Sequence, residues 1–251
     1  MQEINFLMPS GGHFPDSLAE MTLKEMTVRE EKALFTSKQP FVKMQQLLTN
    51  TFVSGLDKEG NEVGRINLSS WPLVDMTHAL LKLRSVTIGK DYDFTVQCPI
   101  CDRAVSYGVD LEDGLDVKFA EPGIEPVYSV KLSFGVIKLK HLLVKDQHVI
   151  DRLVRQKKSR EGRNFDGGYT IRLASQIVAV DDNEFASPVT AEVWLEGRTS
   201  REREEISVAL DTHSFGDDLS IAIDCPYCNA VEDAVMPITR DFLFRRKHRR
   251  G

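Results

Sequence analysis

The chain contains two short stretches in which apolar and polar residues alternate, and each leads into a Cys-Pro-x-Cys sequence. Residues 89–98 read GKDYDFTVQC and residues 216–225 read GDDLSIAIDC. A period of two is typical of a strand that buries one face. A second apolar run follows each cysteine pair, at 104–111 and at 230–238. The pattern therefore predicts two β-hairpins, each with a cysteine pair at its turn.

Helical periodicity is found in the segments before and between these hairpins. Thr27 as N-cap, with Glu30 reaching back to it, predicts a helix within 27–36. Ser70 as N-cap, with Pro72 in the first turn, predicts a helix that ends near Gly89. Apolar spacing predicts further helical segments at 44–52, 138–154 and 191–210, a strand at the start of residues 1–20, a strand at 127–134, and an apolar periodic segment at 169–180. Polar sequence, much of it glycine-rich, predicts loops at 55–64, 156–168 and 181–188.

The two cysteine stretches match at a constant offset of 127 residues, which aligns Gly89 with Gly216 and Pro99 with Pro226. Similar elements precede each stretch in a similar order. We therefore expect an α+β fold of two similar pseudo-repeat halves, each with helices and a β-hairpin that ends in a Cys-Pro-x-Cys zinc knuckle. The expected halves are residues 1–120 and residues 121–251, the second of which carries a basic C-terminal tail.

The four cysteines are the candidate metal ligands: Cys98, Cys101, Cys225 and Cys228. Two thiolates on one tight turn can face the same ion, and two such turns supply the closed tetrahedral set of a structural zinc site. Asp102 and Asn229 follow the two pairs, and these residue types tolerate the left-handed backbone that a tight turn needs. Disulfides are the first alternative, although the start of the chain lacks a secretory leader and the chain is not rich in cysteine. Redox-active pairs are the second, although such pairs open a helix, whereas strands flank these.

Composition places few limits on function. The chain has 251 residues, 41% of them hydrophobic, and a formal net charge of −6, which is ordinary for a soluble cytoplasmic protein. No run approaches the ~20 apolar residues that span a bilayer. The acidic balance argues weakly against general nucleic-acid binding.

No motif for catalysis stands out, so we expect a protein that is not an enzyme. His141 and His148, seven residues apart on one expected helix, are a weak candidate metal pair, and His213 is a weak candidate donor to a thiolate. Two basic runs are candidate surfaces for phosphates or for an acidic protein. They comprise Arg152, Arg155, Lys157, Lys158, Arg160 and Arg163 in the first, and Arg240, Arg245, Arg246, Lys247, Arg249 and Arg250 in the second.

The order of several features resembles a known family. Leu-Met-Pro-Ser-Gly at 7–11 precedes Thr-x-Arg-Glu-Glu at 27–31, and Asp75, Arg84 and Gly89 then precede the strand and the Cys-Pro-x-Cys turn. In this order and spacing, residues 5–111 resemble the baseplate hub and hub-assembly proteins of T4-like contractile-tailed phages. Residues 127–235 form a weaker second copy, which lacks Thr-x-Arg-Glu-Glu and has Asp211 where Arg84 stands.

The resemblance implies a non-enzymatic protein that helps to build the central hub of the tail baseplate. It would be made in the cytoplasm of the host cell, contact other baseplate and hub proteins, and either stay in the virion or act only in assembly. A structural zinc ion would join its two halves, and a homo-oligomer is compatible with this role. The alternative from a different class is a zinc-ribbon-type nucleic-acid-binding protein that uses its basic C-terminal tail.

Overall fold

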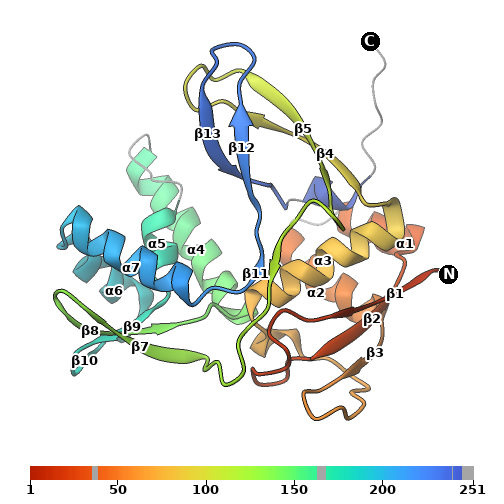
Figure 1. The fold of residues 1–251 in the computed structure, drawn as a ribbon, viewed down its shortest axis with the longest axis horizontal. Helices are drawn as coiled ribbons and strands as arrows, with labels where there is room; N and C mark the ends of the chain where they lie inside the picture. The colour runs from red at the N-terminus through yellow and green to blue at the C-terminus, as the bar shows by residue number, and fades with distance from the viewer. Residues whose placement is uncertain (36–38, 163–167, 239, 245–251) are drawn as a thin grey trace.

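The computed structural model describes residues 1–35, 39–162, 168–238 and 240–244. Helices and several small antiparallel sheets make up a mixed α and β fold (Figure 1). The N-terminal half and the residues after 121 each form a sheet with helices packed on it. A pair of β-hairpins projects from the top of the molecule in this view.

The first half is built on a three-stranded antiparallel sheet of order β1-β2-β3, with β1 at Glu3–Leu7, β2 at Glu20–Lys24 and β3 at Phe52–Leu56. Two helices, α1 (Val28–Phe35) and α2 (Pro40–Thr51), connect β2 to β3. A short 3₁₀ turn, η1 (Leu68–Ser70), leads into α3 (Leu73–Ile88), which packs against β1 and β2. The hairpin of β4 (Asp91–Gln97) and β5 (Ala104–Asp110) follows.

The elements of the second half follow a similar order, with one more helix before the cysteine hairpin. The hairpin of β7 (Val127–Leu132) and β8 (Gly135–Lys140) is followed by α4 (Val144–Glu161) and α5 (Tyr169–Ala174), and then by β9 (Ile177–Val180), which pairs with β8. A short strand, β10 (Asn183–Glu184), extends the sheet, whose order is β10-β9-β8-β7. Two helices, α6 (Pro188–Glu196) and α7 (Ser200–Thr212), take the place that α3 has in the first half. The hairpin of β12 (Ser220–Asp224) and β13 (Val231–Val235) then completes the half.

Two larger apolar cores and one small cluster hold these elements together. The first core surrounds Trp71 and α3, and the second lies between the β7–β10 sheet and α5–α7. The end of the chain returns to the first core, because Met236, Phe242 and Leu243 are all buried there. A two-stranded ribbon of β6 (Val117–Lys118) and β11 (Gly216–Asp217) also joins the two halves. The second hairpin is thus fixed to the first half of the molecule.

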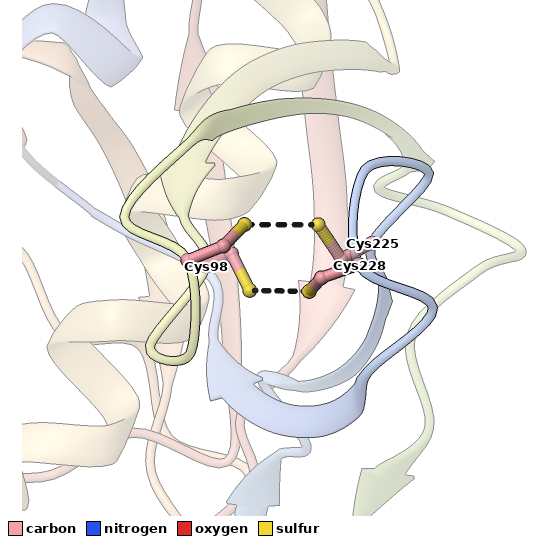
Figure 2. Close-up of side chains that lie close together, drawn as sticks. Cys98, Cys225 and Cys228 are labelled. Atoms are coloured by element: carbon pink, nitrogen blue, oxygen red, sulfur yellow. Dashed lines mark hydrogen bonds between the residues drawn. The ribbon is translucent and has the colours of Figure 1, made fainter.

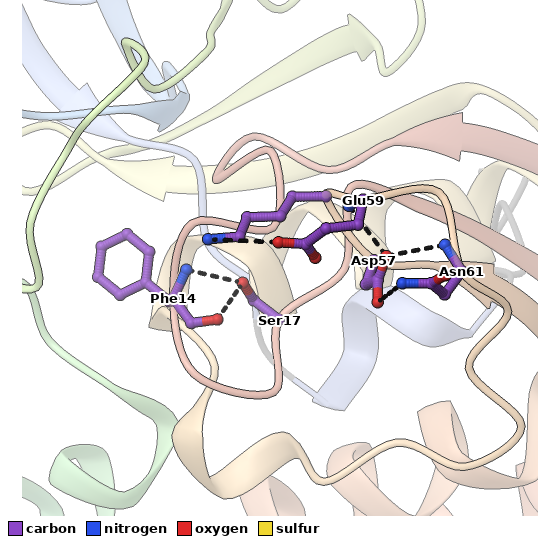
Figure 3. A network of polar contacts seen from close by, with 6 residues as sticks. Phe14, Ser17, Asp57, Glu59 and Asn61 are labelled. Carbon is purple, nitrogen blue, oxygen red and sulfur yellow. Dashed lines mark hydrogen bonds and ion pairs between the residues drawn. The ribbon is translucent and has the colours of Figure 1, made fainter.

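The first two residues of the expected loop at 55–64 belong to β3, and the rest of the loop is closed by one carboxylate (Figure 3). Asp57 accepts hydrogen bonds from the backbone N–H groups of Glu59 and Asn61 at 2.9 and 2.8 Å and from Asn61 Nδ2 at 2.9 Å. These donors, Asn61 above all, lower the pKa of Asp57. The same figure shows Ser17 closing the neighbouring loop through Phe14, whose N–H donates to Ser17 Oγ at 3.0 Å. Both loops are therefore ordered by short-range polar contacts.

Several predicted helix boundaries need correction. Glu30 accepts from the Thr27 N–H at 2.7 Å, which confirms that end of α1. Ser70, however, lies in η1, and Pro72 takes the N-cap position of α3. The helix expected at 138–154 begins only at Val144, because residues 138–140 complete β8, and it continues to Glu161, into the first part of the expected loop at 156–168. The segment at 169–180 divides into α5 and β9, and the segment at 191–210 divides into α6 and α7.

Candidate metal centre

The structure brings all four cysteines together. Their sulfur atoms lie within 4.8 Å of one another, although the two pairs come from hairpins at opposite ends of the sequence. Figure 2 shows the two turns facing each other, with Cys98 Sγ 3.7 Å from Cys228 Sγ and Cys101 Sγ 3.6 Å from Cys225 Sγ. Each of these short distances separates a sulfur atom of one turn from a sulfur atom of the other turn. The site therefore belongs to both hairpins together.

The two turns have the same backbone design. The Cys98 N–H donates to Arg103 O at 2.9 Å, and the Cys225 N–H donates to Ala230 O at 3.0 Å. The residue after the second cysteine of each pair, Asp102 or Asn229, donates its N–H to the backbone carbonyl oxygen of the first cysteine at 2.9 Å. Asp102 has a φ of 57° and Asn229 a φ of 58°, which confirms the left-handed conformation that the sequence predicts for them. Each turn thus directs both of its sulfur atoms to the same side.

The distances between the sulfur atoms fit a tetrahedral site of four thiolates better than they fit disulfides. Four sulfur atoms about 2.3 Å from a central ion lie about 3.8 Å apart, which is close to the two shortest separations here. A disulfide needs a separation of about 2.05 Å, and all four cysteines are free thiols. The cluster can therefore hold a metal ion.

The four sulfur atoms differ in environment. Cys98 and Cys225 are buried in a small apolar cluster with Val105, whereas Cys228 lies at the surface. Burial opposes ionisation of the Cys225 thiol, but the N–H groups of Tyr227 and Cys228 together with the thiols of Cys228 and Cys101 outweigh it and lower the pKa to about 7. The Ala230 N–H lowers the pKa of Cys228, but desolvation and the neighbouring sulfur atoms raise it to about 12. Adjacent thiolates thus resist ionising together, and a bound cation would relieve this repulsion.

Contacts around the cluster fix how the hairpins sit. Tyr107 Oη in β5 donates to Asp224 O in β12 at 3.1 Å, directly beside the cysteines. Tyr92 Oη in β4 donates to Pro237 O at 3.0 Å, just after β13. Arg84, at the end of α3, is buried and donates to the carbonyl groups of Gly89, Asp91 and Phe242 at 2.5, 2.8 and 3.0 Å. The first hairpin and the end of the chain are therefore held by one guanidinium group.

Two buried carboxylates also stabilise the region below the hairpins, and sequence reasoning assigned neither of them a partner. Asp75 accepts from the Ser10 N–H at 3.0 Å and from Ser10 Oγ at 2.5 Å. Asp217 in β11 contacts His78 Nδ1 in α3 at 2.9 Å, and both side chains are almost fully buried. The sequence places Asp75 and His78 on the apolar helix α3, and Asp75 is also part of the pattern that resembles baseplate proteins. Their partners are 65 and 139 residues away, so local sequence could not identify them.

The other candidate residues lie elsewhere. His141 precedes α4 and packs among aromatic rings, where burial lowers its pKa to about 4, whereas His148 lies on α4 and contacts Gln45 and Phe41. The expectation that these two histidines share a helix is therefore wrong. His213 caps α7, with its Nδ1 2.8 Å from Ala209 O and its ring stacked on Tyr128.

The basic runs are only partly within the described residues. Arg152, Arg155, Lys157, Lys158 and Arg160 all lie on α4, whereas Arg163 lies outside the described residues. Of the C-terminal tail, Phe242 and Leu243 are buried as apolar anchors. The cationic residues 245–250 lie outside the described part of the chain.

Comparisons with known proteins identify one family. None of the helices in the described residues is long and apolar enough to cross a membrane. A search of curated proteins gives no match, and a search of solved structures gives none either. Residues 1–156, more than half of the chain, match the family described as T4 bacteriophage base plate protein, which confirms the resemblance to a T4-like baseplate protein. The chain is therefore a member of the T4 bacteriophage base plate protein family.

Proposed function

We propose that the protein is a structural or assembly component of the central hub of a contractile-tail baseplate, and that one structural zinc ion stiffens it. The family match supports a role in the phage baseplate. The observation that carries the zinc proposal is the convergence of four thiol sulfur atoms from two distant hairpins within 4.8 Å. The protein acts by binding other baseplate and hub proteins and has no catalytic role. It assembles in the host cytoplasm.

Zinc is the metal that the donor set favours. A closed set of four thiolates suits Zn²⁺ and leaves no position open for water, so the ion is structural. Such sites contribute about 10 kcal/mol or more to folding. Here that free energy would hold the second hairpin against the first, in addition to the apolar contacts of Met236 and Phe242 with the first core.

The two halves, residues 1–120 and 121–251, are copies of one ancestral unit. Several observations support this proposal. Both halves run in the order hairpin, two helices, third strand, helical segment (α3 in the first half, α6 and α7 in the second) and cysteine hairpin, and in both the third strand pairs with the second strand through an irregular register. Gly89 and Gly216, at the aligned positions, have φ values of 120° and 111°. A duplicated unit gives two equivalent turns that meet about one ion.

Nucleic-acid binding through the tail, the alternative interpretation of the sequence, gains no support from the family match.

The proposal that one zinc ion is shared by both cysteine pairs can be tested by mutation. Cys98→Ser and Cys225→Ser should each destabilise the whole chain by several kcal/mol, and the double variant should cost little more than either single one, because the first change already removes the ion. Ser106→Ala, an exposed change on β5, serves as the matched control. Additive losses, or unfolding of one hairpin alone, would contradict a shared ion.

The baseplate role has its own test. A phage that lacks the gene should yield no complete baseplates in infected-cell lysates viewed by electron microscopy. The wild-type gene supplied in trans should restore them, and the Cys98→Ser gene should not. Normal baseplates without the gene would refute the role, whatever the metal content.

A further inference from the structure

Charge is divided unevenly between two parts of the molecule. The residues that build the two cysteine hairpins and their connections, 89–125 and 216–235, contain fourteen acidic residues and only three basic ones. The rest of the chain carries a formal charge of +5, which equals the charge of the five cationic residues at 245–250, outside the described part of the chain. The hairpins, here called the hairpin pair (β4–β5 with β12–β13), project from the body in Figure 1. Within the hairpin pair itself, residues 91–110 and 220–235, seven residues are acidic and one is basic, so the projection is acidic.

The strongest basic surface lies on α4. Four cations lie on one side of this helix over about 20 Å and are exposed. This α4 face comprises Lys145, Arg152, Arg155 and Lys158. None of the four is paired with a carboxylate of another described residue. Asp151 is the acidic residue among them, and it instead accepts from Gln147 and interacts with Arg172.

Within one copy the two surfaces are held apart. The hairpin pair is fixed to the first core through Tyr92, Arg84 and the returning end of the chain, whereas α4 joins that core at its first residue, Val144, and continues into the second half. No ion pair between described residues joins the α4 face to the hairpin pair. Complementary surfaces that form no ion pair within one molecule can pair between two.

We propose that the α4 face binds the hairpin pair of a second copy of this chain in a head-to-tail contact. The outer strand of the pair, β13, suits this contact because it is about 17 Å long and exposes Glu232 and Asp233. Its Val231 and Val235 are 69% and 68% exposed, so docking would also cover apolar side chains. When two copies bind in this way, the α4 face of one copy and the hairpin pair of the other stay free. Further copies can bind to them, so the contact builds rings or linear arrays. This inference goes beyond the proposed function and does not depend on which metal the cysteines hold.

Sedimentation velocity of the purified full chain tests the proposal. At about 50 mM NaCl the wild type should associate as its concentration rises, and at about 500 mM NaCl the association should weaken at least about tenfold because salt screens exposed charges. Two double variants should each be monomeric at low salt: Arg152→Glu/Arg155→Glu on the α4 face, and Glu232→Lys/Asp233→Lys on β13. Arg29→Glu/Arg65→Glu makes the same charge change as the first variant on exposed residues away from α4, and it should associate like the wild type.

Mixing the two monomeric variants is the decisive arm. The native hairpin pair of the first variant can bind the native α4 face of the second, so the mixture should associate at low salt. Three results would overturn the proposal. The wild type could stay monomeric at low salt, both charge-reversal variants could still associate, or the mixture of the two variants could stay monomeric. If a labelled DNA duplex binds the α4 face while the chain remains monomeric, the surface serves a nucleic acid and the proposal is wrong.

Discussion

Asp75 should make the stability of this protein fall as pH rises. Its side chain is fully buried, and burial raises its pKa from 3.8 to about 7, against the opposing effect of the Ser10 hydrogen bonds. Asp217 adds to this increase through its negative charge. The folded protein therefore keeps the Asp75 proton in a pH range where the unfolded chain has lost it. The contribution is fully present below about pH 4 and is lost as pH rises through about 7.

The magnitude follows from the size of the shift. Each unit of pKa difference is worth about 1.4 kcal/mol, so ionised Asp75 costs about 4 kcal/mol relative to the protonated form. Asp75→Asn removes the ionisation and keeps the shape and the contacts with Ser10. Compared with the wild type, the variant should gain about 1.4 kcal/mol per pH unit between pH 5 and 7 and then reach a plateau.

Urea unfolding at a series of pH values, followed by circular dichroism, measures this difference directly. Subtracting the wild type from the variant cancels other titrating groups, including the cysteines. Asp182→Asn, a change at an exposed carboxylate, serves as the control. A stability difference for Asp75→Asn that is flat between pH 5 and 8 would refute the reasoning.

Other changes test how the hairpins and the end of the chain are held. Arg84→Met should lower the free energy of unfolding by about 3 kcal/mol, because three backbone carbonyl groups lose their buried charged donor, and limited proteolysis should then cut first near residue 240. Cutting at the same rate as in the wild type would contradict this anchoring role. Gly216→Ala should cost about 2 kcal/mol or more, since φ is 111° and a new Cβ would lie 2.8 Å from Val74 Cβ. Gly89→Ala has a similar φ but open space around it, so it should cost less in the same thermal unfolding assay; equal losses would show that packing against Val74 is unimportant.

The sequence predicts local structure well where one pattern excludes the others. Strands with a period of two on either side of Cys-Pro-x-Cys leave a hairpin as the simple solution, and β4–β5 and β12–β13 confirm it. The left-handed turn positions of Asp102 and Asn229 follow from residue type alone. The prediction fails at residues 138–140, because Leu139 fits both a helix that continues to Val154 and the alternating strand β8. The hairpin with β7 decides between these two, and that contact is tertiary.

The site itself was predictable only because the cysteine sequence occurs twice. Four cysteines with matching neighbours indicate one shared site, and the structure places their sulfur atoms together. The polar contacts that support the site were not predictable in the same way. Arg84 binds a carbonyl group 158 residues away, and His78 binds an aspartate 139 residues away, so their roles depend on the folded chain. Burying such groups is costly unless partners meet them, and no local pattern records where the partners lie.

Zinc K-edge X-ray absorption of the purified full chain tests the central claim most directly. One zinc ion per chain, with a single shell of four sulfur atoms at about 2.3 Å, is the predicted result. A shell of two sulfur atoms completed by nitrogen or oxygen would show that each turn binds alone, and a chain purified without metal would show that the four cysteines hold no ion. Either result would contradict a single zinc ion bound by the cysteines of both hairpins.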